Sequence, residues 1–239
     1  MKICIQPGHI NIPFNCIPAL RTSTGAPGEQ EFTLRIVNRL SEILRSKGFE
    51  VKQTDANANC DPKVTGVDWD LYLAVHYDAN VYGTGGGFVD FPEPSTDGAT
   101  QESQRIAQAI REEYFNHSGI VNHPERSNSN TRFYYMWRAL SAKTPCVILE
   151  CGVGKDAHDS VILADTERVS NAIARGVTKA FGIAFDAPIP PTDPCITVRK
   201  ELEEANKKIK ELQNQLTFEV TNRKTIANQS IELLKKLTI

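Results

Sequence analysis

Three titratable side chains stand at the ends of short apolar runs in the sequence. His9 comes after the run 2–6, His76 follows the run 71–75, and Glu150 closes the run 145–149. In an open α/β sheet, reactive groups gather beyond the carboxyl ends of the strands, so these side chains are expected to meet at one edge. Two imidazoles with a carboxylate match the ligand set of a catalytic zinc site, which keeps one position open for water.

A third ligand is needed, and two carboxylates at the start of a predicted helix can supply it. Glu29 and Glu31 are the candidates. Either one has a purely structural interpretation, because the helix dipole and N-terminal capping favour acidic residues in the first turn. The residues alone leave the choice between them open.

The expected chemistry is hydrolysis of an amide. A zinc ion held by two neutral imidazoles and one carboxylate lowers the pKa of its bound water toward about 7 and polarises an amide carbonyl. A second carboxylate takes the proton from that water and passes it to the leaving nitrogen. Glu150 suits this role of general base, because burial behind an apolar strand raises the pKa of a carboxyl group. The competing interpretation of Glu150 is a structural ion pair.

The elements that position these residues alternate between short apolar runs and longer helical patterns. This pattern predicts an α/β fold with a mostly parallel sheet of about six strands and helices on both faces. Helices are expected over 29–47, ending at Gly48, over 100–116, and from an N-cap at Thr166 to Phe181. The strand candidates are 2–6, 49–53, 70–75, 86–91, 132–137 and 145–150.

The last quarter of the chain has a different character. Four prolines between residues 187 and 194 predict an extended linker, placed at 186–196, after a catalytic domain of residues 1–185. In the segment 197–239, apolar residues from Val198 to Leu216 alternate steps of four and three, which predicts a coiled-coil seam of nearly three heptads. This helical segment is expected either to form a homo-oligomer or to target the cell wall.

Charge and composition exclude several classes of protein. The formal net charge is −2; residues 198–239 contribute +3 and the remainder −5, so the main body lacks the basic footprint of a nucleic-acid-binding protein. No apolar stretch reaches the roughly 18 residues of a membrane span, and the first residues do not resemble a signal peptide. The six scattered cysteines include no CxxC pair, which predicts buried reduced thiols and folding in a reducing cytosol.

Four segments resemble the zinc-dependent N-acetylmuramoyl-L-alanine amidases of the amidase-3 type. They lie in the family's order between residues 2 and about 184. The resemblance implies that His9, Glu29 and His76 bind Zn²⁺ and that Glu150 is catalytic. The family's spacing between the ligand Glu and the Gly that ends the helix selects Glu29 over Glu31. The segments are Ile5-Gln6-Pro7-Gly8-His9, Gly25-Ala26-Pro27-Gly28-Glu29, Leu73-Ala74-Val75-His76-Tyr77-Asp78-Ala79 and Thr144-Pro145-Cys146-Val147-Ile148-Leu149-Glu150-Cys151-Gly152.

The chain departs from the family pattern beside both histidines. Gln6 replaces a frequent Asp before Pro-Gly-His, and Tyr77-Asp78 replaces the usual Ala-Asn after the second His. The substrate-binding residues therefore remain unassigned by the resemblance.

The function implied is hydrolysis of the amide between N-acetylmuramic acid and L-alanine in peptidoglycan. Family members that lack a signal peptide and carry a C-terminal appendage resemble phage endolysins. Such enzymes accumulate in the host cytoplasm and act on the wall after release. Two alternatives stay open: a zinc peptidase acting on the stem peptide, and a non-catalytic wall-binding or assembly protein. The predicted partner is bacterial peptidoglycan, without nucleic acid and without membrane insertion.

Other reactive residues have simpler explanations. His117 and His123 lie in a polar segment that is expected to be a solvated loop, and His158 is the alternative metal ligand. Cys151 has no motif-placed histidine partner, so packing explains it better than nucleophilic catalysis. The glycine run 83–87 precedes a strand and not a helix, which excludes a phosphate-binding loop.

Overall fold

The computed structural model describes residues 1–10, 25–54, 61–78, 83–92, 101–127 and 140–186. The chain splits into two units, Met1–Ala187 and Pro188–Ile239, and every described residue belongs to the first. Three predictions lie outside the described residues: the strand 132–137, the helical segment 197–239, and the linker 186–196 except for Asp186. The domain boundaries stay predictions.

Five strands form one sheet, in the order β2-β1-β3-β5-β4. The first four in that order run parallel to one another, whereas β4 pairs antiparallel with β5. The chain passes from β1 through a helix to β2 on one side, and then to β3 on the other side of β1. The bounds are β1 Lys2–Pro7, β2 Glu50–Gln53, β3 Leu71–Asp78, β4 Phe88–Asp90 and β5 Cys146–Val153.

The predicted sheet needs two corrections. The described residues form five strands and not about six, and the sheet is mixed, because β4 is antiparallel. The connection 79–87 between β3 and β4 is shorter than the dozen or more residues that a parallel crossover needs, so β4 runs antiparallel to β3 and thus to β5, which is parallel to β3. A third difference concerns strand length: β3 and β5 continue beyond the predicted ends at residues 75 and 150. His76 and Glu150 therefore lie within strands.

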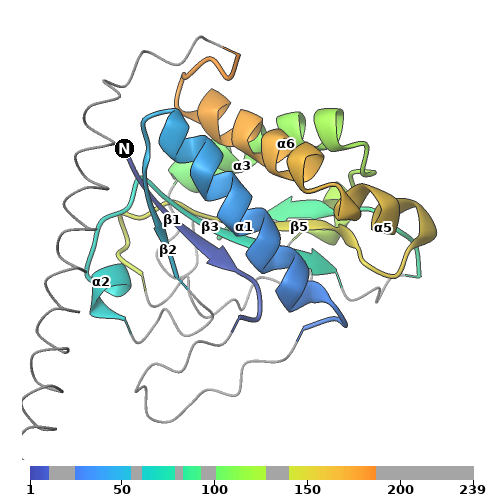
Figure 1. Ribbon diagram of the computed structural model, residues 1–239. Helices are drawn as coiled ribbons and strands as arrows, with labels where there is room; N and C mark the ends of the chain where they lie inside the picture. Colours follow the sequence, from blue (N-terminus) through green and yellow to red (C-terminus); the bar gives the residue numbers. More distant parts are fainter. Residues whose placement is uncertain (11–24, 55–60, 79–82, 93–100, 128–139, 187–239) are drawn as a thin grey trace, which may run out of the picture. The chain divides into compact units, whose positions relative to one another are not determined.

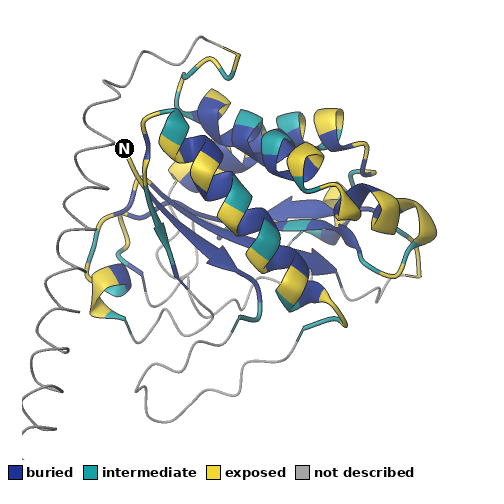
Figure 2. Cartoon of the chain, in the orientation of Figure 1, coloured by how far each residue is buried: buried dark blue, intermediate teal, exposed yellow. Residues whose placement is uncertain are grey.

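Three long helices cover one face of the sheet (Figure 1). They are α1 Glu29–Ser46, α3 Gln101–Ser118 and α6 Thr166–Ala180, close to their predicted positions. Each places apolar side chains toward the strands, and the outward faces of the helices are exposed (Figure 2). In α1, Ile36, Val37, Leu40 and Leu44 are fully buried. Burying a side chain of this size contributes about 1.5–3 kcal/mol, so this stripe fixes α1 against the sheet.

The opposite face of the sheet is covered differently. Its smaller apolar cluster joins Cys4, Tyr72 and Ile148 of the strands to Trp69 and to Val64 of the one-turn helix α2 (Pro62–Thr65). The predicted helices on both faces are thus confirmed only through α2 in the described part of the chain. The sequence interpretation also missed α2, the short helix α5 (Ala157–Ala164) and the 3₁₀ turn η2 (Pro124–Arg126).

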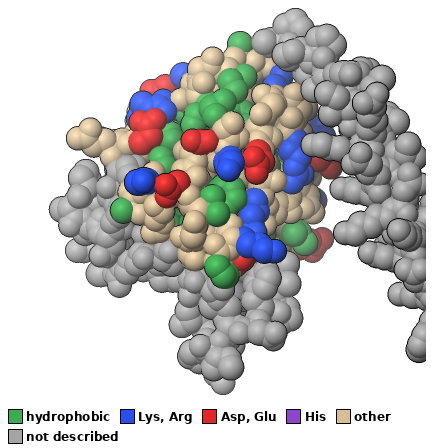
Figure 3. Space-filling view, turned by 90° about the vertical axis from the view of Figure 1, so that its left-hand side faces the viewer, with side chains coloured by type: hydrophobic (Ala, Val, Ile, Leu, Met, Phe, Trp, Pro, Cys, Tyr) green, Lys and Arg blue, Asp and Glu red, His purple; other side chains and the backbone are tan. Residues whose placement is uncertain are grey.

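The described cysteines are buried, and the surface carries charged residues of both signs. Cys4, Cys146 and Cys151 are buried and free, as predicted, while the other three cysteines lie outside the described residues. Lys, Arg, Asp and Glu side chains are interspersed with small apolar areas on the face that Figure 3 shows. None of the helices within the described ranges combines the length and the apolar character needed to cross a bilayer.

Candidate metal centre and catalytic carboxylate

His9 lies just after β1, in a turn that α1 holds in place. Gly8 extends the strand pairing by donating its N–H to the carbonyl of Val75 (2.8 Å). The side chains of Gln30 and Thr33 in α1 then donate to the carbonyls of His9 (2.6 Å) and Gly8 (3.0 Å). His9 itself has φ 57, in the left-handed region that non-glycine residues rarely adopt. Such strain is typical of functional sites where surrounding contacts impose it.

Glu29 is the first residue of α1 and is only 2% exposed. One carboxylate oxygen, Oε2, accepts the backbone N–H of Ala26 (2.8 Å). The other, Oε1, lies 3.1 Å from Nδ1 of His76 and 3.5 Å from Nε2 of His9. The carboxylate therefore stands between the two imidazoles, which come from the ends of neighbouring strands.

His76 lies within β3, beside the end of β1. Its ring meets the ring of His9 edge to face, with centroids 5.0 Å apart. The backbone of Gly8 passes so close that a Cβ there would lie 2.5 Å from Nδ1 of His76, which only glycine avoids. β1 and β3 flank the point where the strand order reverses, and this is where open α/β sheets bind ligands.

His9, Glu29 and His76 form a group that could hold a metal ion. Each offers one ligand atom, and these atoms lie within 4.8 Å of one another. Burial lowers the pKa of His76 and outweighs the opposing effect of Glu29. Burial alone would raise the pKa of Glu29, but its hydrogen bond to His76, the charges of both histidines and the Ala26 N–H lower it overall. A neutral imidazole and an ionised carboxylate are the forms that bind metals, so the donor set fits.

Glu150 lies beside this group on the neighbouring strand. It is the register partner of His76, so both side chains project from the same face of the sheet. Its Oε2 atom is enclosed and has no hydrogen-bond partner among the described residues. Burial raises the pKa of Glu150 well above its usual value of 4.5, and the charges of Glu29 and Asp78 raise it further. The described residues thus offer no ion pair to this carboxylate.

The remaining histidines lie apart from this group. His117 belongs to the last turn of α3 and pairs with Glu113 (3.1 Å), so the prediction of a loop there is wrong. His123 pairs with Glu125 (2.7 Å). His158 contacts Asp159 (3.2 Å) in a separate acidic group with Asp156.

That second group is structural. The Asp156 side chain accepts two backbone N–H groups as the N-cap of α5. Oδ2 of Asp159 accepts the N–H groups of Gly86 (2.5 Å) and Val153 (3.0 Å). Both carboxylates therefore hold the start of α5 and the nearby glycine segment. His158 offers a ligand atom to this separate group and not to the group of His9, Glu29 and His76.

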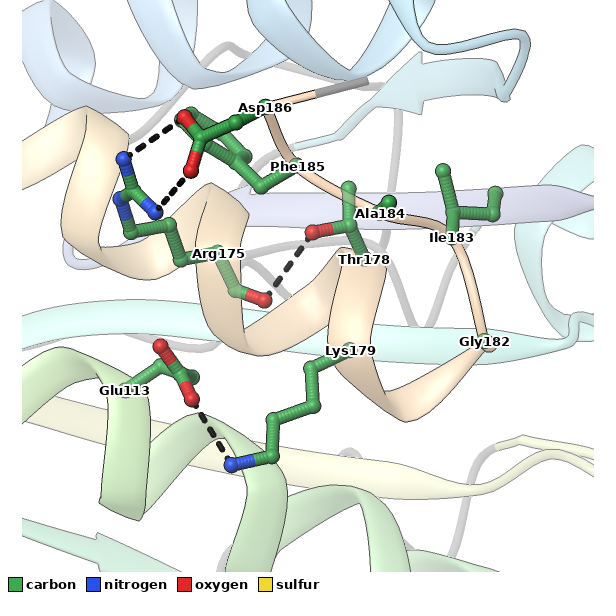
Figure 4. A pocket seen from close by; sticks show the side chains of 9 residues that line it. All are labelled: Glu113, Arg175, Thr178, Lys179, Gly182, Ile183, Ala184, Phe185 and Asp186. Atoms are coloured by element: carbon green, nitrogen blue, oxygen red, sulfur yellow. Dashed lines mark hydrogen bonds and ion pairs between the residues drawn. The ribbon is translucent and has the colours of Figure 1, made fainter.

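A surface pocket lies where α6 ends, and it contains none of the candidate site residues (Figure 4). Its cations are already paired: Arg175 with Asp186 (2.9 Å) and Lys179 with Glu113 (2.7 Å). A smaller hollow borders the turn before α1 and is lined in part by Glu31, which is exposed. Glu31 is therefore outside the metal group.

Residues 3–180 match the Amidase_3 family, described as N-acetylmuramoyl-L-alanine amidase. The chain belongs to this family. By family and fold, its activity is that of a peptidoglycan N-acetylmuramoyl-L-alanine amidase. No curated protein matches the chain.

Several solved amidases share the fold. The amidase Ami1 from Mycobacterium smegmatis is 19% identical with a TM-score of 0.57, over 76% of this chain and 97% of that one. The CwlD amidase from Clostridioides difficile, solved with the GerS lipoprotein, is 17% identical with a TM-score of 0.55, over 76% and 98%. The catalytic domain of the CD27L endolysin, which targets Clostridia difficile, is 19% identical with a TM-score of 0.56, over 75% and 97%.

The structure brings together the four residues singled out in the sequence, and it adds others. Gln30 and Thr33 hold the His9 turn, and Tyr77 donates its backbone N–H to Oε1 of Glu29 (3.3 Å). The sequence carried one hint of this: Tyr77 directly follows His76 at a position where the family pattern has a small residue. Nothing in the spacing of Gln30 and Thr33 indicates that their side chains turn back toward the strand end.

Proposed function

We propose that this amidase uses zinc-activated water, with His9, Glu29 and His76 as metal ligands and Glu150 as general base. The observation that carries the proposal is the position of Glu150, whose carboxylate lies beside His76 with one enclosed oxygen that no described residue engages. A carboxylate oxygen that is enclosed for structural reasons usually has a hydrogen-bond partner. An unpartnered carboxylate oxygen beside a metal-binding group can accept a proton from a water molecule and release it again.

His9, Glu29 and His76 would hold the ion. When bound, zinc would supply the charge that lowers the pKa of a water molecule toward about 7 and polarises the scissile carbonyl. The backbone N–H groups of Ala26 and Tyr77 orient the Glu29 carboxylate, and α1 orients His9 through its backbone carbonyl. Such outer contacts fix the direction from which each ligand atom points.

Glu150 would move the proton. Its carboxylate would take a proton from the attacking water and deliver it to the departing nitrogen of L-alanine. Burial shifts the pKa of Glu150 upward, in the direction of the working pH, where a general acid and base is most effective. The products are a muramic acid lactyl carboxylate and a stem peptide with a free N-terminal alanine.

Replacing the general base tests the proposal. Glu150→Gln is expected to keep one zinc per chain while its kcat on purified peptidoglycan falls by about 10²–10⁴-fold, the usual contribution of general acid–base catalysis. Metal analysis and release of new amino ends measure the two effects. Mass spectrometry of the wild-type products separates an amidase from a stem-peptide peptidase, because only the amidase frees intact peptides that begin with alanine. A fully active Glu150→Gln variant would exclude Glu150 as the base.

Two glutamates on the same helical turn give a matched test of the ligand set. Loss of an outer contact to a ligand typically costs 10–100-fold in metal affinity, so Glu29→Gln is expected to cost at least about 100-fold. Glu31→Gln should bind zinc as the wild type does, because Glu31 is exposed and outside the metal group. Equal zinc affinity in both variants would exclude Glu29 as a ligand. A wild-type chain without zinc that still binds cell walls would favour the non-catalytic alternative.

We also propose that the chain is a phage or prophage endolysin that acts on the wall after release from the host cytoplasm. The likeness to the CD27L endolysin catalytic domain and the free, buried cysteines support this. The enzyme made inside bacteria without an export route should leave the cells intact until their membrane is permeabilised, after which they should lyse. Lysis that does not depend on permeabilisation would contradict this role.

A further inference from the structure

Tyr77 of β3 contacts the turn that precedes Glu29, residues 25–28. Tyr77 follows His76 directly, so its side chain projects from the opposite face of the sheet, and it is 7% exposed. Its ring packs against Phe32 of α1, with centroids 5.1 Å apart. On another side it lies against Gly154, where a Cβ would come 2.7 Å from the ring. The ring is therefore held between α1 and the chain that follows β5.

Tyr77 contacts both the Glu29 carboxylate and the turn from which Glu29 projects. Its backbone N–H donates to Oε1 of Glu29 (3.3 Å), the oxygen that faces both histidines. Its hydroxyl donates to the backbone carbonyl of Pro27, two residues before Glu29. Gly28 leaves room for this approach, because a Cβ there would lie 2.9 Å from the hydroxyl oxygen. One residue thus links the metal ligands of β3 and α1.

The turn before Glu29 needs such a contact. Gly25 and Gly28 both have positive φ, of 70° and 85°, and glycine loses more backbone freedom on folding than any other residue. Gly28 is the N-cap of α1 and has no side chain to close the first helical turn. The hydrogen bonds between Ala26 and Glu29 join the turn to α1, and the Tyr77 hydroxyl joins it to β3.

We propose that Tyr77 is a positioning residue for the metal site, and that its hydroxyl and ring hold the Gly25–Gly28 turn so that Glu29 stands between His9 and His76. The inference rests on the proposed ligand set. An alanine at position 77 could not reach the Pro27 carbonyl, so the contact depends on the tyrosine side chain.

Tyr77→Phe tests the proposal because it keeps the ring and removes only the hydroxyl. The zinc affinity of the metal-free protein is measured by competition with a chromophoric chelator. We expect the dissociation constant for zinc to rise by about 10-fold, at the lower end of the range for outer contacts to metal ligands.

Tyr114→Phe is the matched control. It removes another buried tyrosine hydroxyl that donates to a backbone carbonyl, that of Cys151 (2.7 Å), but it touches no proposed ligand. It should lose a similar amount of thermal stability and keep wild-type zinc affinity. Wild-type zinc affinity in Tyr77→Phe, or an equal loss in Tyr114→Phe, would overturn the proposal. A wild-type protein that binds no zinc would instead overturn the ligand set itself.

Discussion

At the scale of single residues, the carboxylate of Glu150 has a position that costs stability. Its Oε2 has no hydrogen-bond partner among the described residues, and the carboxylates of Glu29 and Asp78 oppose its ionisation. An unpaired charge in such a place is costly to bury. The metal-free protein should therefore become more stable when this charge is removed.

Glu150→Gln is expected to raise the melting temperature of the metal-free protein at pH 7. The pKa of Glu150 is higher in the folded state than its usual 4.5, so the folded wild type binds the proton more tightly. The stability that this proton gives is fully present below pH 4.5 and is lost as the pH rises through the folded-state pKa. The variant's advantage should therefore be absent near pH 4 and grow toward neutrality.

Thermal unfolding of both proteins, without metal and across this pH range, measures the effect. In a domain of 150–250 residues, a gain of about 1 kcal/mol raises the melting temperature by about 2–4 °C. Glu31→Gln is the control, since exposed substitutions change stability by less than about 0.5 kcal/mol. A Glu150→Gln variant that is equally or less stable at pH 7 would show that the ionised carboxylate has a partner in the folded protein.

The sequence predicted which residues lie close together better than it predicted their surroundings. The position of His9, His76 and Glu150 near strand ends was enough to group them, because parallel strands bring those ends to one edge. Glu29 could not be separated from Glu31 on local grounds, since both are acidic residues of the same helical turn. The role of Tyr77 was not visible, because it depends on how the Pro27 carbonyl folds back onto β3.

At the scale of elements, apolar periodicity predicted the three long helices. The short apolar runs did not predict the direction of every strand. A short strand such as β4 carries no information on its direction, and only the short connection before it indicates that it is antiparallel. The helix α5 was missed because its apolar residues do not form one buried stripe: Val161 is 73% exposed. Its N-cap, Asp156, was the available signal.

The packing of α3 against α6 depends on a residue without a side chain. A Cβ at Gly176 would lie 2.5 Å from Cα of Ile110 and 3.2 Å from the carbonyl of Ala109, both backbone atoms of α3. Gly176→Ala should therefore destabilise the protein by up to about 2 kcal/mol. The overpacking costs about 1–3 kcal/mol, and the better helix propensity of alanine offsets about 1 kcal/mol of it.

Denaturant unfolding measures this change, with Gln104→Ala on the exposed side of α3 as the control. The control should stay within about 0.5 kcal/mol of the wild type. If Gly176→Ala were more stable than the wild type, the two helices could separate without cost, and the close approach would not be what holds them.

At the scale of the whole molecule, the last residues of the described unit, 183–186, contact the helix α6. The N–H of Ile183 donates to the Thr178 carbonyl (2.9 Å), and the ring of Phe185 lies under the guanidinium of Arg175, 4.3 Å from its centroid. Arg175 in turn makes two hydrogen bonds to the carboxylate of Asp186 (Figure 4). A chain that ended at the sequence-based boundary, residue 185, would keep Phe185 and lose the Arg175–Asp186 pair.

A chain of residues 1–186 should therefore keep the melting temperature and the zinc affinity of the full chain, whereas residues 1–182 should be less stable because the Phe185 and Asp186 contacts are lost.

The heptads predicted between Val198 and Leu216 favour self-association, since an isolated helix of this length is marginal without a packing partner. Light scattering should thus give the full chain at least twice the mass of one copy and the 1–186 chain the mass of one. Equal association of both would place the contact in the catalytic unit. Two monomers would favour wall targeting by the tail, which a pull-down of residues 187–239 fused to an inert carrier with purified walls would measure.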